Sequence, residues 1–207
     1  MMATLPALLS RPLPVLLDGA VGTELARRGL DTTLPLWSAR ALLADPGLET
    51  LARIHEDYAR AGAEILVTNT FRTTLRSLGR AGRGDAWRPA NRRAVECARA
   101  GAAAGAQAVT GPGAPDHVCL VAGGIAPLED CYRPDLVPPQ PECLAEHRRQ
   151  VELLAETGVD LIFIETMNCV REAEAAGLAA RDSGLPVLLS LCPRVPGHLF
   201  SGERLED

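Results

Sequence analysis

The stretch Gly158-Val159-Asp160-Leu161-Ile162-Phe163-Ile164-Glu165-Thr166 decides the fold that this sequence predicts. Its apolar run, residues 161–164, has the length and β-branched content of a strand buried on both faces. The run ends at a carboxylate, Glu165. Because α/β folds place their sites at the carboxyl ends of parallel strands, Glu165 is a candidate site residue. The alternative is that Glu165 caps the following helix or forms a surface ion pair.

The unit around this strand recurs along the chain. Residues 61–67, 157–163 and 183–188 each contain a helix end, a glycine, a two-residue link and an apolar strand. Strands that alternate with helices predict a parallel sheet with right-handed crossovers. We expect strands at 15–17, 64–67, 118–122, 161–164 and 186–191. We expect helices at 24–28, 45–61, 89–104, 141–157 and 170–180, with a further short element at 106–110.

Most of these strands lead into polar side chains. They are Asp18, Asn69 with Thr70, Glu165 with Thr166, and Ser190. Polar residues gathered at the carboxyl ends of parallel strands are typical of the site of a (β/α) barrel. A doubly wound sheet is the competing fold, but no G-x-G-x-x-G follows the first strand.

Composition restricts the function further. The chain has 207 residues, enough for a single domain, and residues 1–14 are expected to form a loose leader. The net charge of −5 gives no reason to expect nucleic acid or an anionic membrane as a partner. No apolar run is long enough to span a bilayer, and there is no convincing export signal, so we expect a cytoplasmic protein.

Two residue types exclude particular chemistries. All 21 basic residues are arginine, which excludes a lysine Schiff base and a P-loop lysine. The six cysteines form no C-x-x-C pair, and a disulfide framework is not expected. His55 and His147 fall in predicted helices, where a packed or partly exposed imidazole is the expectation.

Four segments, in this order along the chain, carry a resemblance to a known family. They are Asp18-Gly19-Ala20-Val21-Gly22-Thr23-Glu24-Leu25, Asn69-Thr70-Phe71, Tyr132-Arg133-Pro134-Asp135, and Phe163-Ile164-Glu165-Thr166 with Glu172-Ala173. Together they resemble the homocysteine S-methyltransferase family. The resemblance implies a (β/α)₈ TIM-type barrel and transfer of a methyl group to the thiol of homocysteine, giving methionine. Methyl donors across the family include S-methylmethionine, betaine and methylfolate.

The resemblance also implies roles for individual residues. Asp18 and Glu165 match homocysteine contacts of the family and would hold the substrate ammonium by charge-assisted hydrogen bonds. Backbone N–H groups of the turn from Gly19 to Thr23 would receive the carboxylate, and Asn69 and Thr70 would line the same rim. Family members activate the thiol with zinc held by cysteine thiolates.

The sequence departs from the family pattern where the zinc ligands are expected. The family's Gly-Gly-Cys-Cys segment is absent, and Asn168-Cys169 imitates an Asn-Cys segment but follows the Glu165 strand, which is too early. Cys131, Cys169 and Cys192 each follow a predicted strand and are the remaining candidate metal ligands, although three ordinary thiols are the simpler interpretation. Five strands of eight are counted, and residues 202–207 resemble the start of the helix after the fifth. A barrel that is open after strand five is expected to be marginally stable alone or to self-associate through its edges.

Three functions remain in competition at this point. The chain is a homocysteine S-methyltransferase with impaired or no activity, or a non-catalytic remnant or segment completed by another polypeptide that at most binds an amino acid. The third possibility is a different barrel enzyme that uses Asp18 and Glu165 as general acid and base.

Overall fold

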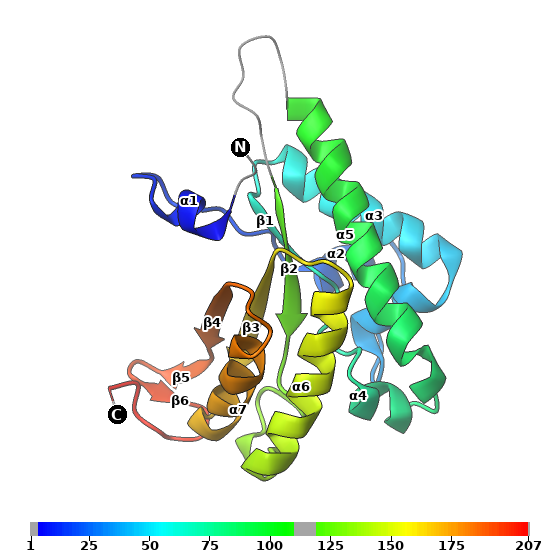
Figure 1. The fold of residues 1–207 in the computed structure, drawn as a ribbon. Coiled ribbons are helices and arrows are strands. Elements are labelled where there is room, and N and C mark those ends of the chain that lie inside the picture. The colour runs from blue at the N-terminus through cyan, green and yellow to red at the C-terminus, as the bar shows by residue number, and fades with distance from the viewer. Residues whose placement is uncertain (1–3, 110–118, 207) are drawn as a thin grey trace.

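A parallel sheet of four strands forms the centre of the molecule (Figure 1). The computed structural model describes residues 4–109 and 119–206. The strands are β1 (Ile65–Val67), β2 (Leu120–Ile125), β3 (Leu161–Met167) and β4 (Val187–Leu191), and they pair in that order. Consecutive strands are neighbours and every pair is parallel, which is the arrangement in a segment of a (β/α) barrel.

The long helices pack on one face of the sheet. They are α3 (Asp45–Arg60), α5 (Trp87–Val109), α6 (Gln140–Glu156) and α7 (Val170–Arg181). Strand residues Leu66, Val121 and Ile162 form one core with Leu154 of α6 and Ala176 of α7. Shorter helical elements join them: α2 (Val21–Arg27), α4 (Leu75–Arg80), and the 3₁₀ turns η1 (Trp37–Leu43), η2 (Gly84–Ala86) and η3 (Pro134–Leu136).

The N-terminal segment contains a helix where a loose leader was expected. Helix α1 (Leu5–Leu9) begins at Thr4, whose side chain accepts a hydrogen bond from the N–H of Ala7. Leu5 and Leu8, one turn apart, are buried against Ile65 and Leu161 on the inner face of the sheet. The expectation of a loose leader is therefore wrong for residues 5–9, because an apolar pair in this segment covers the amino-terminal ends of the strands.

The first predicted strand is reduced to a single bridge. Leu17 pairs with Ile65 in parallel, and the carbonyl of Leu16 accepts hydrogen bonds from the N–H groups of Glu64 and Ile65. Pro12 and Pro14 remove backbone donors just before this segment, so no longer ladder precedes it. Of the five predicted strands, four are present in the described residues as β1 to β4, and the first is an extended edge segment.

The C-terminal residues also differ from the expectation. Strands β5 (Pro193–Val195) and β6 (His198–Leu199) form an antiparallel hairpin, and His198 bridges to Arg204. The expected start of a helix at 202–207 is wrong for residues 202–206, which form turns. Gly197 and Gly202 have φ values of 80° and 90°, a conformation that favours turns over a helix.

Several element boundaries shift by a few residues. Helix α2 begins at Val21 and not at Glu24, and Asp45 is the first residue of α3, with Ala44 at the N-cap position. Helix α5 is longer than predicted and includes the short element expected from residue 106, as far as residue 109. Strands β2 and β3 extend three residues beyond their predicted ends, and the predicted strand start at Val118 lies outside the described residues.

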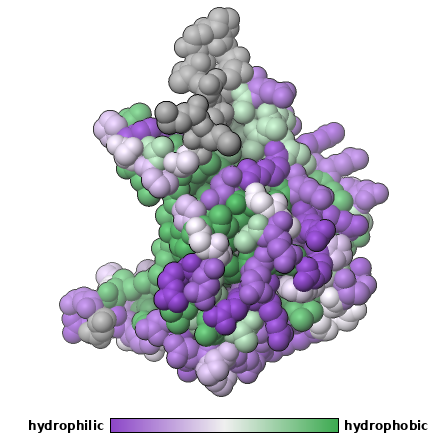
Figure 2. Space-filling model, viewed as in Figure 1, coloured by the Kyte–Doolittle hydropathy of each residue, from purple (hydrophilic) through white to green (hydrophobic). Residues whose placement is uncertain are grey.

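An apolar surface remains open at the β4 edge. Val187, Leu189 and Leu191 alternate along β4 and are exposed, Leu189 by 52%. Their neighbours across the ladder, Ile162 and Ile164, are buried under α7. Figure 2 shows the molecule hollowed on this side, between α1 and the β5–β6 hairpin, with hydrophobic residues in the hollow.

No helix in the described part of the chain combines the length and apolar character that crossing a bilayer requires.

Candidate functional site

A cavity of about 260 Å³ opens at the carboxyl ends of the strands. It lies between the turn after Leu17, the ends of β1 and β3, and η1. Its lining includes Asp18, Gly19, Trp37, Asn69, Phe163 and Glu165. This is the end of a parallel sheet at which α/β proteins bind their ligands. We refer to this cavity as the acid pocket.

Asp18 is held in place by the backbone of β1. Its Oδ2 accepts a hydrogen bond from the N–H of Val67 at 2.9 Å, and its own N–H donates to the carbonyl of Ile65 at 3.0 Å. Only 4% of the side chain is exposed. Burial raises the pKa of Asp18 to about 7, although the N–H groups of Val67 and of Asp18 itself act in the opposite direction.

Glu165 faces the same pocket from β3. Phe163 and Glu165, two residues apart, both line the cavity, as expected for side chains on one face of a strand. The register with β4 shifts between Ile164 and Met167, and Thr166 has a φ of 61°, an unusual value for a β-branched residue. Burial, and then the charge of Asp18, raise the pKa of Glu165 to about 7.

The acid pocket therefore contains two carboxyl groups that disfavour each other's charge. Among the described residues that line it, there is no arginine to compensate them. A cation that entered the pocket would remove the repulsion between the two acids and form charge-assisted hydrogen bonds with both. The arrangement suits a small ligand with an ammonium group.

The other predicted contacts divide into two groups. Gly19 and Asn69 line the pocket, and the side-chain amide of Asn69 donates to the carbonyl of Ser38 at 2.9 Å. Thr70 is buried, and its hydroxyl donates to the carbonyl of Gly124 at 2.7 Å, so it supports the strand ends and is not part of the lining. Thr23 is exposed on α2 and is also not part of the lining. For all six residues, substrate contact stays a prediction.

An aromatic wall was missed in the sequence. Trp37 of η1 and Phe71 both line the pocket, and their rings meet edge to face with centroids 5.5 Å apart. A Cβ on Gly22 would lie 2.4 Å from the Trp37 ring, so only glycine allows the ring to pack there. Phe71 and Gly22 lie inside the quoted motifs, whereas Trp37 lies in a 3₁₀ turn that no periodicity indicates.

The candidate metal ligands do not form a site with the acid pocket. Cys131 and Cys169 are buried, Cys192 is partly exposed, and none of the three lines the pocket. Burial raises the pKa of each of these thiols, which disfavours the thiolate that zinc requires. Within residues 4–109 and 119–206, no group of three His, Cys, Asp or Glu side chains could hold a metal ion. The described residues therefore do not fit the zinc that the resemblance implied.

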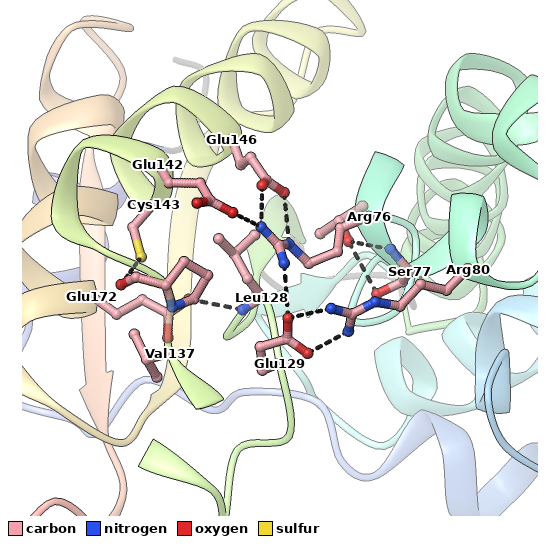
Figure 3. Close-up of polar contacts among 12 residues, drawn as sticks. Arg76, Ser77, Arg80, Leu128, Glu129, Val137, Glu142, Cys143, Glu146 and Glu172 are labelled. Atoms are coloured by element: carbon pink, nitrogen blue, oxygen red, sulfur yellow. Dashed lines mark hydrogen bonds and ion pairs between the residues drawn. The ribbon is translucent and has the colours of Figure 1, made fainter. Parts of the chain in front are cut away.

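A cluster of ion pairs fixes the loop after β2 (Figure 3). Glu129 binds Arg76 at 2.9 Å and also binds Arg80, while Arg76 also binds Glu142 and Glu146 of α6. Burial alone would raise the pKa of Glu129, but the two guanidinium groups outweigh it and hold this pKa below its usual value. Next to this cluster, Glu172 accepts a hydrogen bond from the N–H of Leu128 at 2.8 Å. The loop that carries the predicted Tyr132–Asp135 motif is thus anchored at its start by two carboxylates.

Comparisons with known proteins agree with this architecture. The chain is 35% identical to the homocysteine S-methyltransferase of Escherichia coli (strain K12), over 98% of this chain and 66% of the relative. It is 30% identical to the selenocysteine methyltransferase of Astragalus bisulcatus, over 91% of this chain and 61% of that relative. The crystal structure of the metallated homocysteine methyltransferase MmuM from Escherichia coli superposes with a TM-score of 0.84 at 31% identity, over 98% of this chain and 71% of that chain.

These matches confirm the predicted barrel-type α/β fold, but they cover only part of each relative. The chain spans no more than about two thirds of the length of these curated relatives. The family model for homocysteine S-methyltransferase matches residues 15–207, nearly the whole sequence. The chain belongs to the homocysteine S-methyltransferase family.

Proposed function

We propose that this chain binds homocysteine in the acid pocket, and that it carries the amino-acid half of a thiol methyl-transfer site. The observation that supports this most directly is the pair of uncompensated carboxyl groups, Asp18 and Glu165, facing one small cavity. Each carboxylate would accept a hydrogen bond from the ammonium group of the amino acid. The substrate carboxylate would then lie toward the backbone of the glycine turn at Gly19, away from both acids.

The aromatic wall would cover the carbon chain of the substrate. Trp37, Phe71 and Phe163 give the pocket apolar lining beside its acids. A two-carbon side chain with a thiol is small and mostly apolar, and it fits a cavity of about 260 Å³. The chain's own residues would thus bind and orient the amino acid and exclude water from it.

Transfer of the methyl group requires more than the acid pocket supplies. Sulfur attacks a methyl carbon as a thiolate, and a thiol of this type has a pKa of about 8.5. The described donor set does not fit a zinc site that would stabilise the thiolate. We therefore propose that these 207 residues bind homocysteine but transfer methyl groups poorly or not at all, in the cytoplasm, where six free cysteines are compatible with a reducing environment.

A general acid–base enzyme is the second candidate. Two acids with pKa values near 7 also suit proton transfer at neutral pH. Such an enzyme would not discriminate in favour of a thiol. The similarity to homocysteine methyltransferases favours the first assignment.

Isothermal titration calorimetry with L-homocysteine tests the proposal. We expect Asp18→Asn and Glu165→Gln each to weaken binding by about 10- to 100-fold, the usual value of one charge-assisted hydrogen bond. The deaminated analogue 4-mercaptobutanoate should not bind. Glu152→Gln, an exposed carboxylate on α6, is the control and should bind normally.

Two results would contradict the assignment. Equal binding of homocysteine and 4-mercaptobutanoate would exclude ammonium recognition by the acids. One equivalent of zinc retained by the purified chain with homocysteine present would contradict the impaired transfer.

A further inference from the structure

A buried histidine lies directly behind Asp18. His55 of α3 is 0% exposed, and its Nδ1 is 3.9 Å from Oδ2 of Asp18. Within the described residues, neither ring nitrogen has a hydrogen-bond partner. A buried polar group without a partner costs free energy, and an apolar side chain of similar size would avoid this cost. Packing alone therefore does not explain an imidazole at this position.

Close helix packing holds the ring where it is. A Cβ on Gly101 of α5 would lie 2.4 Å from Cβ of His55, so α5 approaches α3 at the base of this side chain. One turn later, a Cβ on Gly105 would lie 2.3 Å from Cβ of Ala59. The two glycines let the helices approach closely and fix the base of the His55 side chain next to α5. The side chain is preorganised in this sense.

The charge state of His55 suits a hydrogen-bond donor. Burial lowers its pKa to about 4, so the ring is neutral near pH 7. A neutral imidazole carries one N–H, and placing it on Nδ1 directs its positive end at the carboxylate. The charge of Asp18 acts on three described acids: Glu165 of β3, Tyr58 of α3 and Cys119 just before β2. Burial raises the pKa of Tyr58 and of Cys119, so both are neutral near pH 7, whereas a charged Glu165 disfavours the charged form of Asp18 and the imidazole N–H favours it.

We propose that His55 is a positioning residue for Asp18, whose Nδ1–H closes on the carboxylate from within the core when Asp18 ionises, either as the pH rises or as an ammonium group enters the acid pocket. This inference rests on the proposed function. The 3.9 Å separation is longer than a hydrogen bond, and contacts of this kind shorten when the ligand-bound state forms. As the ammonium enters, a proton that either acid still carries at neutral pH leaves to solvent. Both carboxylates are then charged and His55 stays neutral.

The first experiment needs no ligand. In the 207-residue chain labelled with ¹³C at the aspartate carboxyl groups, NMR titration follows the ionisation of Asp18. We expect His55→Leu to raise the pKa of Asp18 by a further unit or so, because the N–H that favours the carboxylate is lost. His55→Asn should restore much of the wild-type value, because its amide nitrogen lies near the position of Nδ1. His55→Gln, whose amide reaches toward the position of Nε2, should not.

The second experiment measures binding of L-homocysteine against pH by calorimetry. We expect His55→Leu to bind about 10-fold more weakly at pH 7, and the deficit to disappear near pH 9, where Asp18 is ionised without help. A purely structural role would weaken binding equally at every pH. Ile54→Val, which changes the adjacent buried residue of α3, is the matched control and should leave the pH profile unchanged.

The outcomes separate this inference from the proposed function. An unchanged Asp18 titration in His55→Leu overturns the role of His55, whether or not homocysteine binds. Absence of homocysteine binding to the wild-type chain at every pH overturns the proposed function, while the titration still decides on His55. If His55→Leu does not fold, the comparison of His55→Asn with His55→Gln decides, and equal titrations in the two overturn the inference.

Discussion

Asp18 and Glu165 store unfavourable free energy in the folded chain. Both have pKa values raised to about 7, so between about pH 4 and 7 the folded state binds protons that the unfolded state has released. The stability that these protonated acids contribute is fully present below about pH 4. It is lost as the pH rises through about 7. A ligand cation would offset the loss, and this links affinity to pH in the opposite direction.

Replacing one acid by its amide should remove that acid's part of this pH dependence. We expect Asp18→Asn to raise the free energy of unfolding at pH 8 by on the order of 2 kcal/mol over wild type, with little difference at pH 4. Urea denaturation at the two pH values measures it. The same difference at both pH values would show that Asp18 titrates normally in the folded chain.

Sequence motifs indicated the two acids but not His55 and Trp37, which lie close to them in the folded chain. Asp18 and Glu165 were predicted because each ends an apolar stretch and matches a family motif. His55 and Trp37 come from segments whose packing depends on distant partners, Gly101 and Gly22, where close approach is visible only in three dimensions. Thr23 is not part of the lining because α2 begins three residues earlier than predicted, which leaves its side chain exposed.

At the scale of elements, ion pairs fix the loop after β2 to α4 and α6. We expect Glu129→Gln to destabilise the chain by about 2 kcal/mol, because it removes the charge shared by Arg76 and Arg80 in a largely buried position. Thermal unfolding at neutral pH measures the loss. Asp135→Asn breaks an exposed ion pair with Arg133 in the same loop and should cost nothing measurable. If the two variants melt alike, the cluster does not contribute to stability.

Elements with a local signal were predicted well. Gly62, Gly158 and Gly184, taken as helix ends from the repeat, have φ values of 102°, 80° and 72°. Strand β3 carries its own apolar run. Helix α1 had no comparable signal, because Leu5 and Leu8 pack against distant strand residues, and the β5–β6 hairpin was not predicted. The strand predicted at 15–17 is a single bridge because Pro12 and Pro14 remove the backbone donors just before it.

At the scale of the whole molecule, the outer face of β4 is the exposed apolar surface most open to association. Val187, Leu189 and Leu191 lie on the face of the sheet on which α7 covers Ile162 and Ile164 of β3. We expect the 207-residue chain to elute as a dimer or larger species that dissociates on dilution. Leu189→Asp should shift the elution toward monomer in size-exclusion chromatography, whereas Leu9→Asp, exposed on α1, should not. A wild-type chain that is monomeric at all concentrations would exclude association through β4.

The hydrogen bond between Val67 N–H and Asp18 gives one side chain two duties. The carboxylate that would bind an incoming amine also holds the edge segment, residues 15–18, against β1, its only neighbour among the described strands. Asparagine at position 18 would keep the hydrogen bond to Val67 and lose the charge, whereas alanine would lose both. A substitution at position 18 therefore affects ligand binding alone only if the new side chain still accepts a hydrogen bond from Val67. Any other substitution also weakens the edge of the sheet.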